Sequence, residues 1–386
     1  MTPPSNSIVP ADAKTTELVC SIANRFAVQG EFVCGEEINS GHINSTYRAT
    51  YQQTDGTQQR YIIQAINRNV FKDPYAVMNN VEKVTRHINS RVLRLKKDLG
   101  GQTLNLFPAR EGGSWIEDEN GTVWRCYNNI EGCVTYDVVE NTRQAYQAAR
   151  AFGSFQDLVS DLPADKIIET IPNFHHTRQR YAKLMEVAAA DPVGRLDSVR
   201  TEFDFIRERE NLVGILLDLQ ASGAIPLRVT HNDTKINNVM LDDATGGTVA
   251  VIDLDTIMPG LPLYDFGEMV RTSASSTLED DPEPANMHVR LPLFRALVQG
   301  YLRSAVGGVL NATERAHLGF SGKLMTYENG IRFLTDYLQG DIYYKIRHPR
   351  HNLDRCRTQF ALVRSIEQSA SEMTAIVAEV EKTIGR

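Results

Sequence analysis

The sequence predicts an α+β fold with a small antiparallel-sheet lobe, residues 1–127, and a larger, mainly helical lobe, residues 128–386. Three observations support this bilobal division. Turn signals separate β-rich runs in the first part, helical periodicity dominates the second part, and 386 residues suffice for two or three domains. With 42% hydrophobic and 23% charged residues the composition is that of a globular protein, so the chain is expected to fold.

The first lobe is expected to alternate helices with hairpins. In chain order we expect a helix over 12–29, strands over 43–51 and 60–66, a long helix from about 74, and a hairpin over 114–124. The pair Asp55-Gly56 is a strong hairpin-turn signal between the first two strands. Pro74 suits the first turn of a helix, because its missing N–H would have no helical partner there.

The second lobe is expected to be mostly helical. Helical periodicity covers 137–159, 175–189, 199–221, 287–305, 312–338 and 353–384, whereas only 227–230, 238–242 and 248–253 resemble strands. A small α+β lobe followed by a larger helical lobe is typical of an enzyme with a cleft.

Charge and cysteine content exclude several classes of protein. A count of 41 Lys and Arg against 48 Asp and Glu gives a net charge of −7, the opposite of what a nucleic-acid-binding protein requires. The five cysteines are scattered and predict neither a disulfide framework nor a zinc site. No apolar run approaches the length of a membrane span. We therefore expect a cytoplasmic protein with no nucleic-acid or membrane partner, and nothing implies a protein partner.

Three polar residues at the ends of short strands carry the strongest chemical signal. Asp233 precedes Asn238 by five positions, and Asp253 ends another apolar strand twenty residues after Asp233. A hairpin loop at 242–247 separates the two strands, so the three side chains should converge at one edge. Phosphoryl transfer requires such a set: a carboxylate that orients and deprotonates the attacking hydroxyl, and oxygen ligands that hold Mg²⁺ on the nucleotide phosphates.

The pattern His231-x-Asp233-x-x-x-x-Asn238 followed by Ile252-Asp253 resembles the catalytic and metal motifs of the aminoglycoside phosphotransferase and choline kinase group. That group has a protein-kinase-like fold. Within it, the sequence is most similar to the N-acetylhexosamine 1-kinases. The stretches that carry this closer similarity are 67–74, 231–235, 251–256, 337–341 and 357–360, which span nearly the whole chain.

The resemblance implies a role for each residue of the motif. Asp233 would be the catalytic base, Asn238 and Asp253 the magnesium ligands, and His231 a structural support within the loop. Asp255 would be a second metal ligand or a cap of the turn at Thr256, and both interpretations stay open. ATP would be the co-substrate and Mg²⁺ the cofactor.

The nucleotide site is expected in the first lobe and the connector. A polar loop between two predicted strands would cover the phosphates with Ser40, Gly41 and Asn44, although one glycine alone predicts only an ordinary turn. The resemblance places adenine at segment 124–132, where the candidates are Tyr127, Asn129 and Ile130. Tyr127 and Ile130 are equally well interpreted as core residues.

Position 64 departs from the family pattern. Most relatives have a lysine on this strand that pairs with the phosphates and with a glutamate of the following helix, but here the residue is Gln64. Its amide can donate a hydrogen bond to phosphate, while Glu82 can pair with Arg68 or Lys72 instead. This departure keeps open the alternative of an inactive binding module.

The acceptor is expected to be a neutral sugar with an acetamido group. By resemblance, Arg332, Tyr343 and His42 would bind it together with Asp233. Choline is disfavoured because the only tryptophans, Trp115 and Trp124, belong to the sheet lobe. An aminoglycoside, being a polycation, would need acidic residues such as those of 279–283, a run more typical of a solvated loop.

The sequence therefore predicts a sugar 1-kinase of carbohydrate metabolism, which transfers the γ-phosphoryl group of ATP directly to the anomeric hydroxyl of an N-acetylhexosamine. An aminoglycoside or other small-alcohol phosphotransferase is the main alternative. A phosphatase of the haloacid dehalogenase type is less compatible, although Asp253-Leu254-Asp255 mimics its first motif. In that class parallel strands follow the motif, whereas the chain here continues as helices.

Overall fold

The computed structural model describes residues 8–38, 43–95 and 103–384. The chain forms two compact units, each assembled from three segments. The first, which we call the sheet unit, comprises Met1–Asp137, Leu158–Ile171 and Asn237–Pro259. The second, the helical unit, comprises Val138–Asp157, Pro172–Ile236 and Gly260–Arg386. Each unit is described by itself below.

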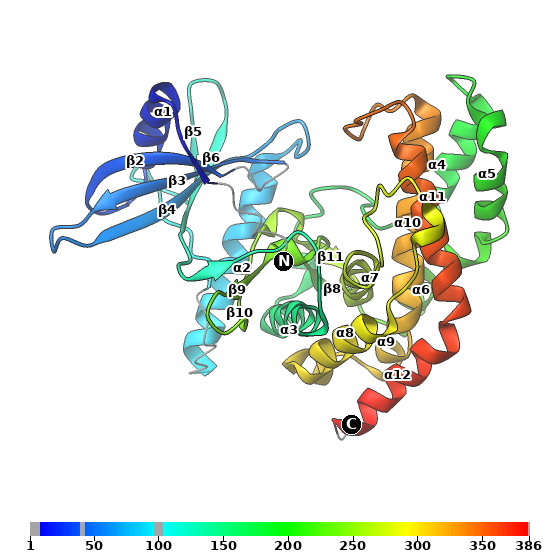
Figure 1. The fold of residues 1–386 in the computed structure, drawn as a ribbon. Coiled ribbons are helices and arrows are strands. Elements are labelled where there is room, and N and C mark those ends of the chain that lie inside the picture. The colour runs from blue at the N-terminus through cyan, green and yellow to red at the C-terminus, as the bar shows by residue number, and fades with distance from the viewer. Residues whose placement is uncertain (1–7, 39–42, 96–102, 385–386) are drawn as a thin grey trace. The chain divides into compact units, whose positions relative to one another are not determined.

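The sheet unit is built on an antiparallel sheet of six strands (Figure 1). In spatial order the strands are β1 (Ile8–Pro10), β2 (Glu31–Ile38), β3 (Ser45–Gln52), β4 (Gln58–Ala65), β6 (Val123–Asn128) and β5 (Ile116–Glu117). The predicted turn between β3 and β4 is present: Gly56 has a positive φ of 85°, and the Asp55 carboxylate accepts the backbone N–H of Thr57 at 2.9 Å. A residue with a side chain would be strained at Gly56.

Two helices accompany this sheet. Helix α1 (Ala13–Ala23) places Val19 and Ile22 in the same buried cluster as Tyr51 and Ile63 of the strands. Helix α2 (Pro74–Leu95) begins at Pro74, as predicted, and buries its apolar residues at helical spacing.

A second, smaller sheet completes the sheet unit. It has the order β10 (Thr248–Val251), β9 (Val239–Asp242) and β7 (Cys133–Val134), and all pairs are antiparallel. The predicted hairpin loop at 242–247 joins β9 to β10, with Asp242 accepting the backbone N–H of Thr245 at 2.6 Å. This hairpin fixes the spacing of the polar residues that flank it.

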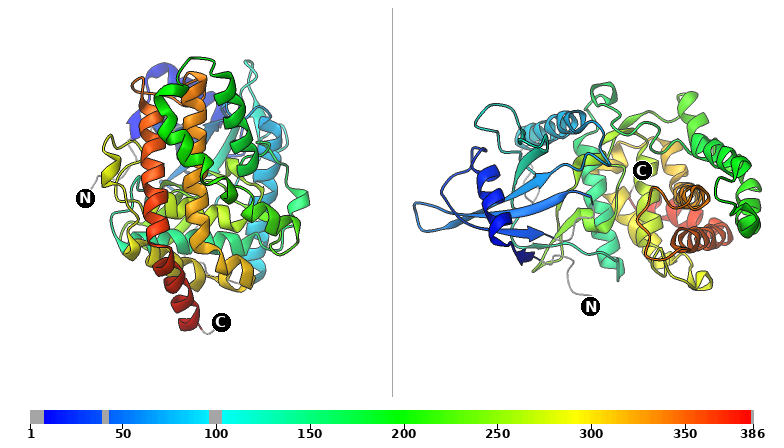
Figure 2. Two further views of the ribbon diagram at one scale, coloured as in Figure 1. Left: turned by 90° about the vertical axis from the view of Figure 1, so that its right-hand side faces the viewer. Right: turned by 90° about the horizontal axis from the view of Figure 1, so that it is seen from above.

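The helical unit contains ten helices among its described residues. They are α3 (Thr142–Leu158, of which the last residue belongs to the sheet unit), α4 (Thr177–Ala190), α5 (Arg200–Arg207), α6 (Ile215–Ala221), α7 (Pro262–Ser273), α8 (Leu291–Arg303), α9 (Ala312–Ala316), α10 (Leu318–Gln339), α11 (His351–Gln368) and α12 (Ala370–Thr383). Strand β8 (Arg228–Thr230) lies in this unit, and β11 (Met258–Gly260) spans the boundary in the chain. Helices α10 and α11 run side by side (Figure 2).

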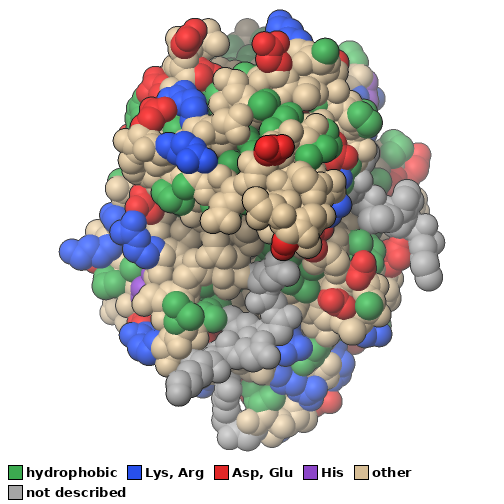
Figure 3. All heavy atoms as spheres, turned by 90° about the vertical axis from the view of Figure 1, so that its left-hand side faces the viewer, with side chains coloured by type: hydrophobic (Ala, Val, Ile, Leu, Met, Phe, Trp, Pro, Cys, Tyr) green, Lys and Arg blue, Asp and Glu red, His purple; other side chains and the backbone are tan. Residues whose placement is uncertain are grey.

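Three predicted helices are interrupted in the structure. The run 199–221 contains α5 and α6, the run 312–338 contains α9 and α10, and the run 353–384 contains α11 and α12. Helical periodicity alone did not reveal these breaks. Within the described ranges, no helix is long and apolar enough to cross a membrane. Acidic and basic side chains are mixed over the face shown in Figure 3.

Candidate active site

The loop that carries Asp233 follows β8 in the helical unit, and α7 holds it in place. The carboxylate of Asp265, in the first turn of α7, accepts the backbone N–H groups of His231 at 2.9 Å and of Asn232 at 2.7 Å. Asn232 has a positive φ of 64°, a conformation that asparagine tolerates better than most residues. One buried carboxylate thus fixes the two residues that precede Asp233.

The pKa of Asp265 reflects this position. Burial raises the pKa of Asp265, and the two backbone N–H bonds together with His231 oppose that rise. Sequence reasoning missed Asp265, because its partners lie more than thirty positions upstream and no local motif connects them.

His231 supports the loop from the inside. Its ring is fully buried and lies edge-on to Phe152 and Phe155 of α3, with ring centroids 5.3 and 5.6 Å away. Its Nδ1 accepts the backbone N–H of Asp233 at 3.3 Å. These contacts are those of a residue that supports the loop, and Asp233 stays the predicted base.

Asp233 itself is partly exposed, with 20% of its side-chain surface accessible. Its Oδ1 lies 3.1 Å from Nζ of Lys235. Lys235 was not among the predicted site residues, although it follows Asp233 by only two positions. This ion pair places a cation beside the predicted base.

The predicted metal ligands Asn238 and Asp253 lie close together in the sheet unit. The backbone N–H of Ile252 donates to the carbonyl of Asn238 at 2.9 Å, which brings the end of β10 beside the start of β9. Asp253 has a positive φ of 59° and an exposed side chain. Non-glycine residues rarely adopt this conformation, so the turn presents the Asp253 carboxylate at some cost in backbone free energy.

The donor set fits magnesium. A carboxylate and an amide oxygen are hard ligands, and Mg²⁺ in proteins is commonly held by one or two such groups with water and phosphate oxygens completing the shell. Within the described residues there is no group of three or more His, Cys, Asp or Glu side chains that would suit a metal held entirely by protein. The residues present therefore agree with a Mg²⁺ site in which water and phosphate oxygens complete the shell.

Asp255 is bound on both carboxylate oxygens. Arg125 of β6 donates through Nη1 to Oδ1, and Asn44 donates through Nδ2 to Oδ2 at 2.6 Å. Arg125 and Asp255 are 1% and 2% exposed, so they form a fully buried ion pair. These bonds connect Asp255 to the large sheet. Asp255 is buried, whereas the side chain of Asp253 is exposed.

Arg125 also binds Gln64. The two residues are directly opposite in the β4–β6 register, and Gln64 Oε1 accepts from Nε of Arg125 at 3.0 Å and from Nη2 at 2.9 Å. Gln64 Nε2 donates to Thr46 at 2.9 Å. Sequence reasoning missed Arg125; the available signal was an arginine in an otherwise apolar strand, which requires a buried partner.

The expected partners of Glu82 were wrong. Glu82 forms an ion pair with Arg86, one turn along α2, and accepts a hydrogen bond from Ser114 at 2.7 Å. Arg68 instead lies 3.6 Å from Glu117. A helical neighbour at i+4 reaches Glu82 more easily than a residue of the preceding loop.

The remaining nucleotide candidates lie in β6 and the segment after it. Tyr127 belongs to β6, is 4% exposed, and lies beneath the Arg125 guanidinium at 5.1 Å. Ile130 is 6% exposed, and the backbone N–H of Asn129 donates to the carbonyl of Arg60 at 3.3 Å. Ser40, Gly41 and His42 lie outside the described residues.

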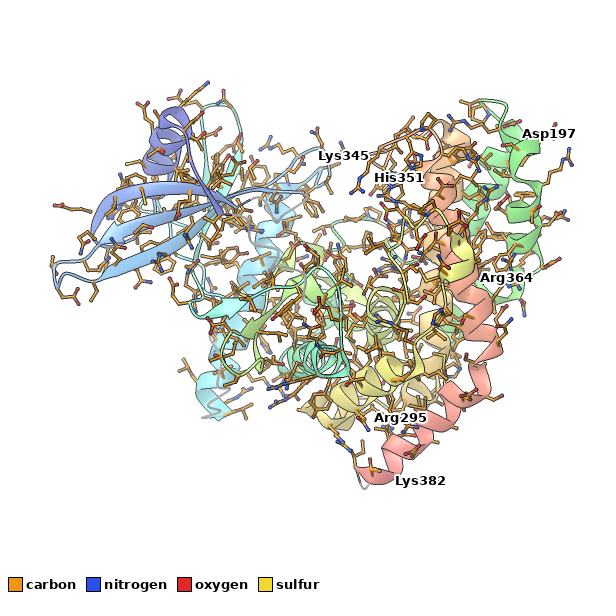
Figure 4. All side chains as sticks on the ribbon, viewed as in Figure 1. Asp197, Arg295, Lys345, His351, Arg364 and Lys382 are labelled. Atoms are coloured by element: carbon orange, nitrogen blue, oxygen red, sulfur yellow. The ribbon has the colours of Figure 1, made fainter. Side chains whose placement is uncertain are left out.

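The predicted acceptor residues lie in the helical unit. Arg332 is on α10, with its guanidinium 5.5 Å from the ring centre of Phe174 and 5.8 Å from that of Tyr344. Tyr343 is 67% exposed and follows α10 in the segment that also contains Lys345 (Figure 4). The Asp336 carboxylate anchors this segment by accepting the backbone N–H groups of Tyr343 at 2.8 Å and of Tyr344 at 3.0 Å.

A carboxylate on a braced loop and an oxygen-ligand pair beside a β-hairpin are features of enzymes that transfer phosphoryl groups. A sequence profile of the phosphotransferase enzyme family matches residues 35–304, more than half of the chain. The chain therefore belongs to the phosphotransferase enzyme family. The expectation of a phosphotransferase is confirmed at this level.

Solved structures agree on the fold. A microcompartment-associated aminopropanol kinase superposes with a TM-score of 0.55 at 14% identity, over 93% of this chain and 98% of that one. An aminoglycoside phosphotransferase from Alicyclobacillus acidocaldarius has a TM-score of 0.54 at 12% identity, over 94% and 95% of the two chains. An amicoumacin kinase, solved with AMP-PNP and Ca²⁺, has a TM-score of 0.54 at 13% identity, over 89% and 92%. The predicted α+β, protein-kinase-like fold is confirmed.

Proposed function

We propose that this phosphotransferase is a Mg²⁺-dependent kinase that transfers the γ-phosphoryl group of ATP to the anomeric hydroxyl of an N-acetylhexosamine. The observation that carries the proposal is the loop at 231–233, where a partly exposed carboxylate follows two residues fixed by Asp265. Phosphoryl transfer depends mainly on positioning and charge stabilisation, and such a loop provides the positioning.

Asp233 is the proposed base. Its carboxylate would accept the proton of the acceptor hydroxyl as the hydroxyl oxygen bonds to the γ-phosphorus and the bond to the β-phosphate oxygen breaks, leaving ADP. Lys235, with Nζ 3.1 Å from Oδ1 of Asp233, would help to orient this carboxylate before the transfer. The described residues suggest no second carboxylate placed for a covalent intermediate, so the transfer would be direct.

Asn238 and Asp253 would hold Mg²⁺. When bound there, the ion would neutralise charge on the nucleotide phosphates. The buried cation Arg125 would add positive charge behind them through its contacts with Asp255 and Gln64. Asp255, with both oxygens occupied, is better suited to holding this arrangement than to binding the metal directly.

The nucleotide is proposed to be ATP, held by Asn44, Gln64, Tyr127, Asn129 and Ile130 together with the loop at 40–41. One structural neighbour was solved with AMP-PNP, which supports an adenine nucleotide in this fold. Gln64 Oε1 is engaged by Arg125, so only its amide N–H groups are suited to phosphate.

The N-acetylhexosamine acceptor rests on the similarity to N-acetylhexosamine 1-kinases over stretches spanning most of the chain. Arg332 and Tyr343 would contact the ring and its acetamido group, with His42 from the loop. A planar guanidinium and an aromatic ring suit a neutral, polar sugar.

The test is a panel of hexoses, N-acetylhexosamines, amino alcohols and aminoglycosides with ATP and Mg²⁺, with ADP release as the measurement. We expect N-acetylhexosamines to give the highest kcat/KM. Phosphorus NMR of the product should show coupling to the anomeric proton. Coupling to the 6-methylene protons would refute the 1-position, and turnover of aminoglycosides alone would refute the acceptor.

The aminoglycoside alternative finds less support in the structure. Its recognition would need free acidic residues, but Glu279 lies 2.5 Å from Arg271, and Asp280 lies 3.2 Å from both His351 and Arg347. Two of the four acidic side chains of this run are therefore already engaged within the helical unit. The phosphatase alternative is excluded by the family assignment.

A further inference from the structure

Two arginines of the helical unit meet at Phe174. Arg180, on α4, donates through Nη2 to the carbonyl of Phe174 at 2.9 Å. Arg332, on α10, lies with its guanidinium 5.5 Å from the centre of the Phe174 ring. Both also lie near Tyr343 and Tyr344, the residues that follow α10. Two positive charges thus share one small region of this unit.

Neither arginine has a carboxylate partner. In the described part of the chain, no carboxylate oxygen lies within 4.0 Å of Arg180 or Arg332, whereas the buried arginines Arg125 and Arg271 each have one or two. The Nε–H of Arg180 is buried and makes no hydrogen bond to a described residue. A buried donor of this kind is costly unless a ligand satisfies it.

The local charge is positive. Burial lowers the pKa of Arg180, and repulsion from Arg332 lowers it further, more than the attraction of Glu328 raises it. The Glu328 carboxylate is already engaged, by His175 Nδ1 at 2.9 Å and by Thr177 Oγ1 at 2.5 Å. Glu268, the other carboxylate that acts on Arg332, is paired with Arg271. This region is therefore unfavourable for a cation.

The region is connected to the catalytic loop. His175 Nε2 lies 3.4 Å from the backbone oxygen of Asn232, the residue before Asp233, and its Nδ1 contacts Glu328 on α10. Glu328 and Arg332 are one helical turn apart on α10. His175 thus connects α10, which carries Arg332, to the loop that carries the proposed base.

We propose that Arg180 acts with Arg332 as a specificity-determining pair that accepts the carbonyl oxygen of an acetamido group and rejects an ammonium group at the same position. This inference rests on the proposed function and names the feature that would distinguish N-acetylhexosamines from free amino sugars and aminoglycosides. The unpaired Nε–H of Arg180 would donate to the carbonyl. An ammonium group offers no acceptor and would be repelled by both guanidiniums.

The experiment compares kcat/KM for N-acetylglucosamine and glucosamine at about pH 6.5. At this pH the C2 amino group of glucosamine, like an α-amino group, is mostly protonated. The variants are Arg180→Gln, which removes the charge, and Arg180→Lys, which keeps it. Arg178→Gln is the matched control, because Arg178 lies on the same helix but is exposed and paired with Asp218. We expect Arg180→Gln to lower the preference for the acetylated sugar by about tenfold, and Arg178→Gln to keep it. Arg180→Lys keeps the charge but lacks the Nε–H, so it should lower the preference less than Arg180→Gln.

Four outcomes would overturn the inference. An unchanged preference in Arg180→Gln, or an equal fall in Arg180→Lys, would show that Arg180 only supports the carbonyl of Phe174. An equal loss of activity on both sugars in Arg180→Gln would likewise show that Arg180 has only this structural role. If the wild-type enzyme phosphorylates no N-acetylhexosamine, the proposed function fails and this inference fails with it. Should Arg180→Gln not fold, Arg332→Gln must reduce the same preference.

Discussion

At the scale of the residue, the structure explains how position 64 can lack a lysine. The positive charge comes from the neighbouring strand, where Arg125 lies opposite Gln64 and binds both its oxygen and Asp255. The three candidates Asp233, Asn238 and Asp253 could be predicted because their spacing is a local pattern. Arg125 and Asp265 could not, because their partners lie far away in the sequence. Arg180 could not, because the charges that act on it, Arg332 and Glu328, are equally distant.

The first prediction concerns Asp233→Asn. The change removes the proposed base and keeps the shape of the side chain, so we expect kcat to fall by about 10²–10⁴. Steady-state ADP release measures the effect. Asp243→Asn is the control, since Asp243 is an exposed carboxylate in the β9–β10 hairpin loop. Near-normal kcat in Asp233→Asn would contradict the assignment.

The second prediction tests the buried charge at Arg125. Arg125→Gln leaves Asp255 buried without its cation and should destabilise the protein by roughly 3–5 kcal/mol, as seen when one partner of a buried pair is removed. Adding Gln64→Lys should restore part of this loss, because a lysine there returns a cation to the same cluster. Urea unfolding measures both.

The control for this pair of changes is Gln59→Lys combined with Arg125→Gln. Gln59 lies on the same strand as Gln64 but is exposed. Gln59→Lys should therefore restore none of the stability that Arg125→Gln loses. Equal recovery by both lysines would mean that net charge, and not the position beside Asp255, is responsible.

At the scale of the element, local signals were sufficient for the hairpins and for the start of α2. The Asp55-Gly56 turn, the start of α2 at Pro74 and the loop at 242–247 all depend on neighbouring residues. Local signals did not reveal the breaks between α5 and α6 and at Ser369. Tertiary packing overrides local propensity at such positions.

The third prediction concerns the close approach of α7 and α10. A Cβ at Gly267 would clash with the backbone oxygen of Ser321 and lie 2.5 Å from Cγ of Met325. Gly267→Ala should therefore destabilise the protein by about 1–3 kcal/mol. It should also lower kcat, because α7 carries Asp265.

Thermal unfolding and ADP release measure the two effects. Gly319→Ala on α10 is the control: its Cβ would lie 3.8 Å from Met373, so the gain in helix propensity, up to about 1 kcal/mol, should dominate. If Gly267→Ala is as stable as Gly319→Ala, the two helices are less tightly packed than the structure indicates.

The fourth prediction concerns the acid sensitivity of α7. Burial alone would raise the pKa of Glu268, but the ion pair with Arg271 outweighs it and lowers that pKa from 4.5 to about 2. A pKa lowered by folding means that the stabilisation is complete above the unfolded value and is lost as pH falls toward the folded value. The free energy of unfolding should therefore fall between about pH 4.5 and pH 2. Urea unfolding across this range should show a smaller fall in Glu268→Gln, and an identical pH profile would contradict the assignment.

At the scale of the whole molecule, the compact units are discontinuous in sequence. Segments Leu158–Ile171 and Asn237–Pro259 return to the sheet unit after the chain has entered the helical unit. Periodicity reports local structure and does not report which distant segments pack together, so this interleaving could not be predicted from sequence. The proposed roles follow it: Asn238 and Asp253 belong to the sheet unit, and Asp233, Arg180 and Arg332 to the helical unit.

The last prediction uses this separation of roles. A ligand that binds only the folded state stabilises it, by about 2.7 kcal/mol at a hundredfold excess over Kd. Mg²⁺ with ATP should therefore raise the melting temperature of the wild-type protein, and EDTA should remove most of the increase. Asp253→Ala should lose the increase, whereas Asp233→Asn, changed in the other unit, should keep it while losing turnover. If both variants lose the increase in melting temperature equally, the roles of metal binding and catalysis are not separated between Asp253 and Asp233. If Asp253→Ala keeps it, Asp253 is not a ligand of the metal.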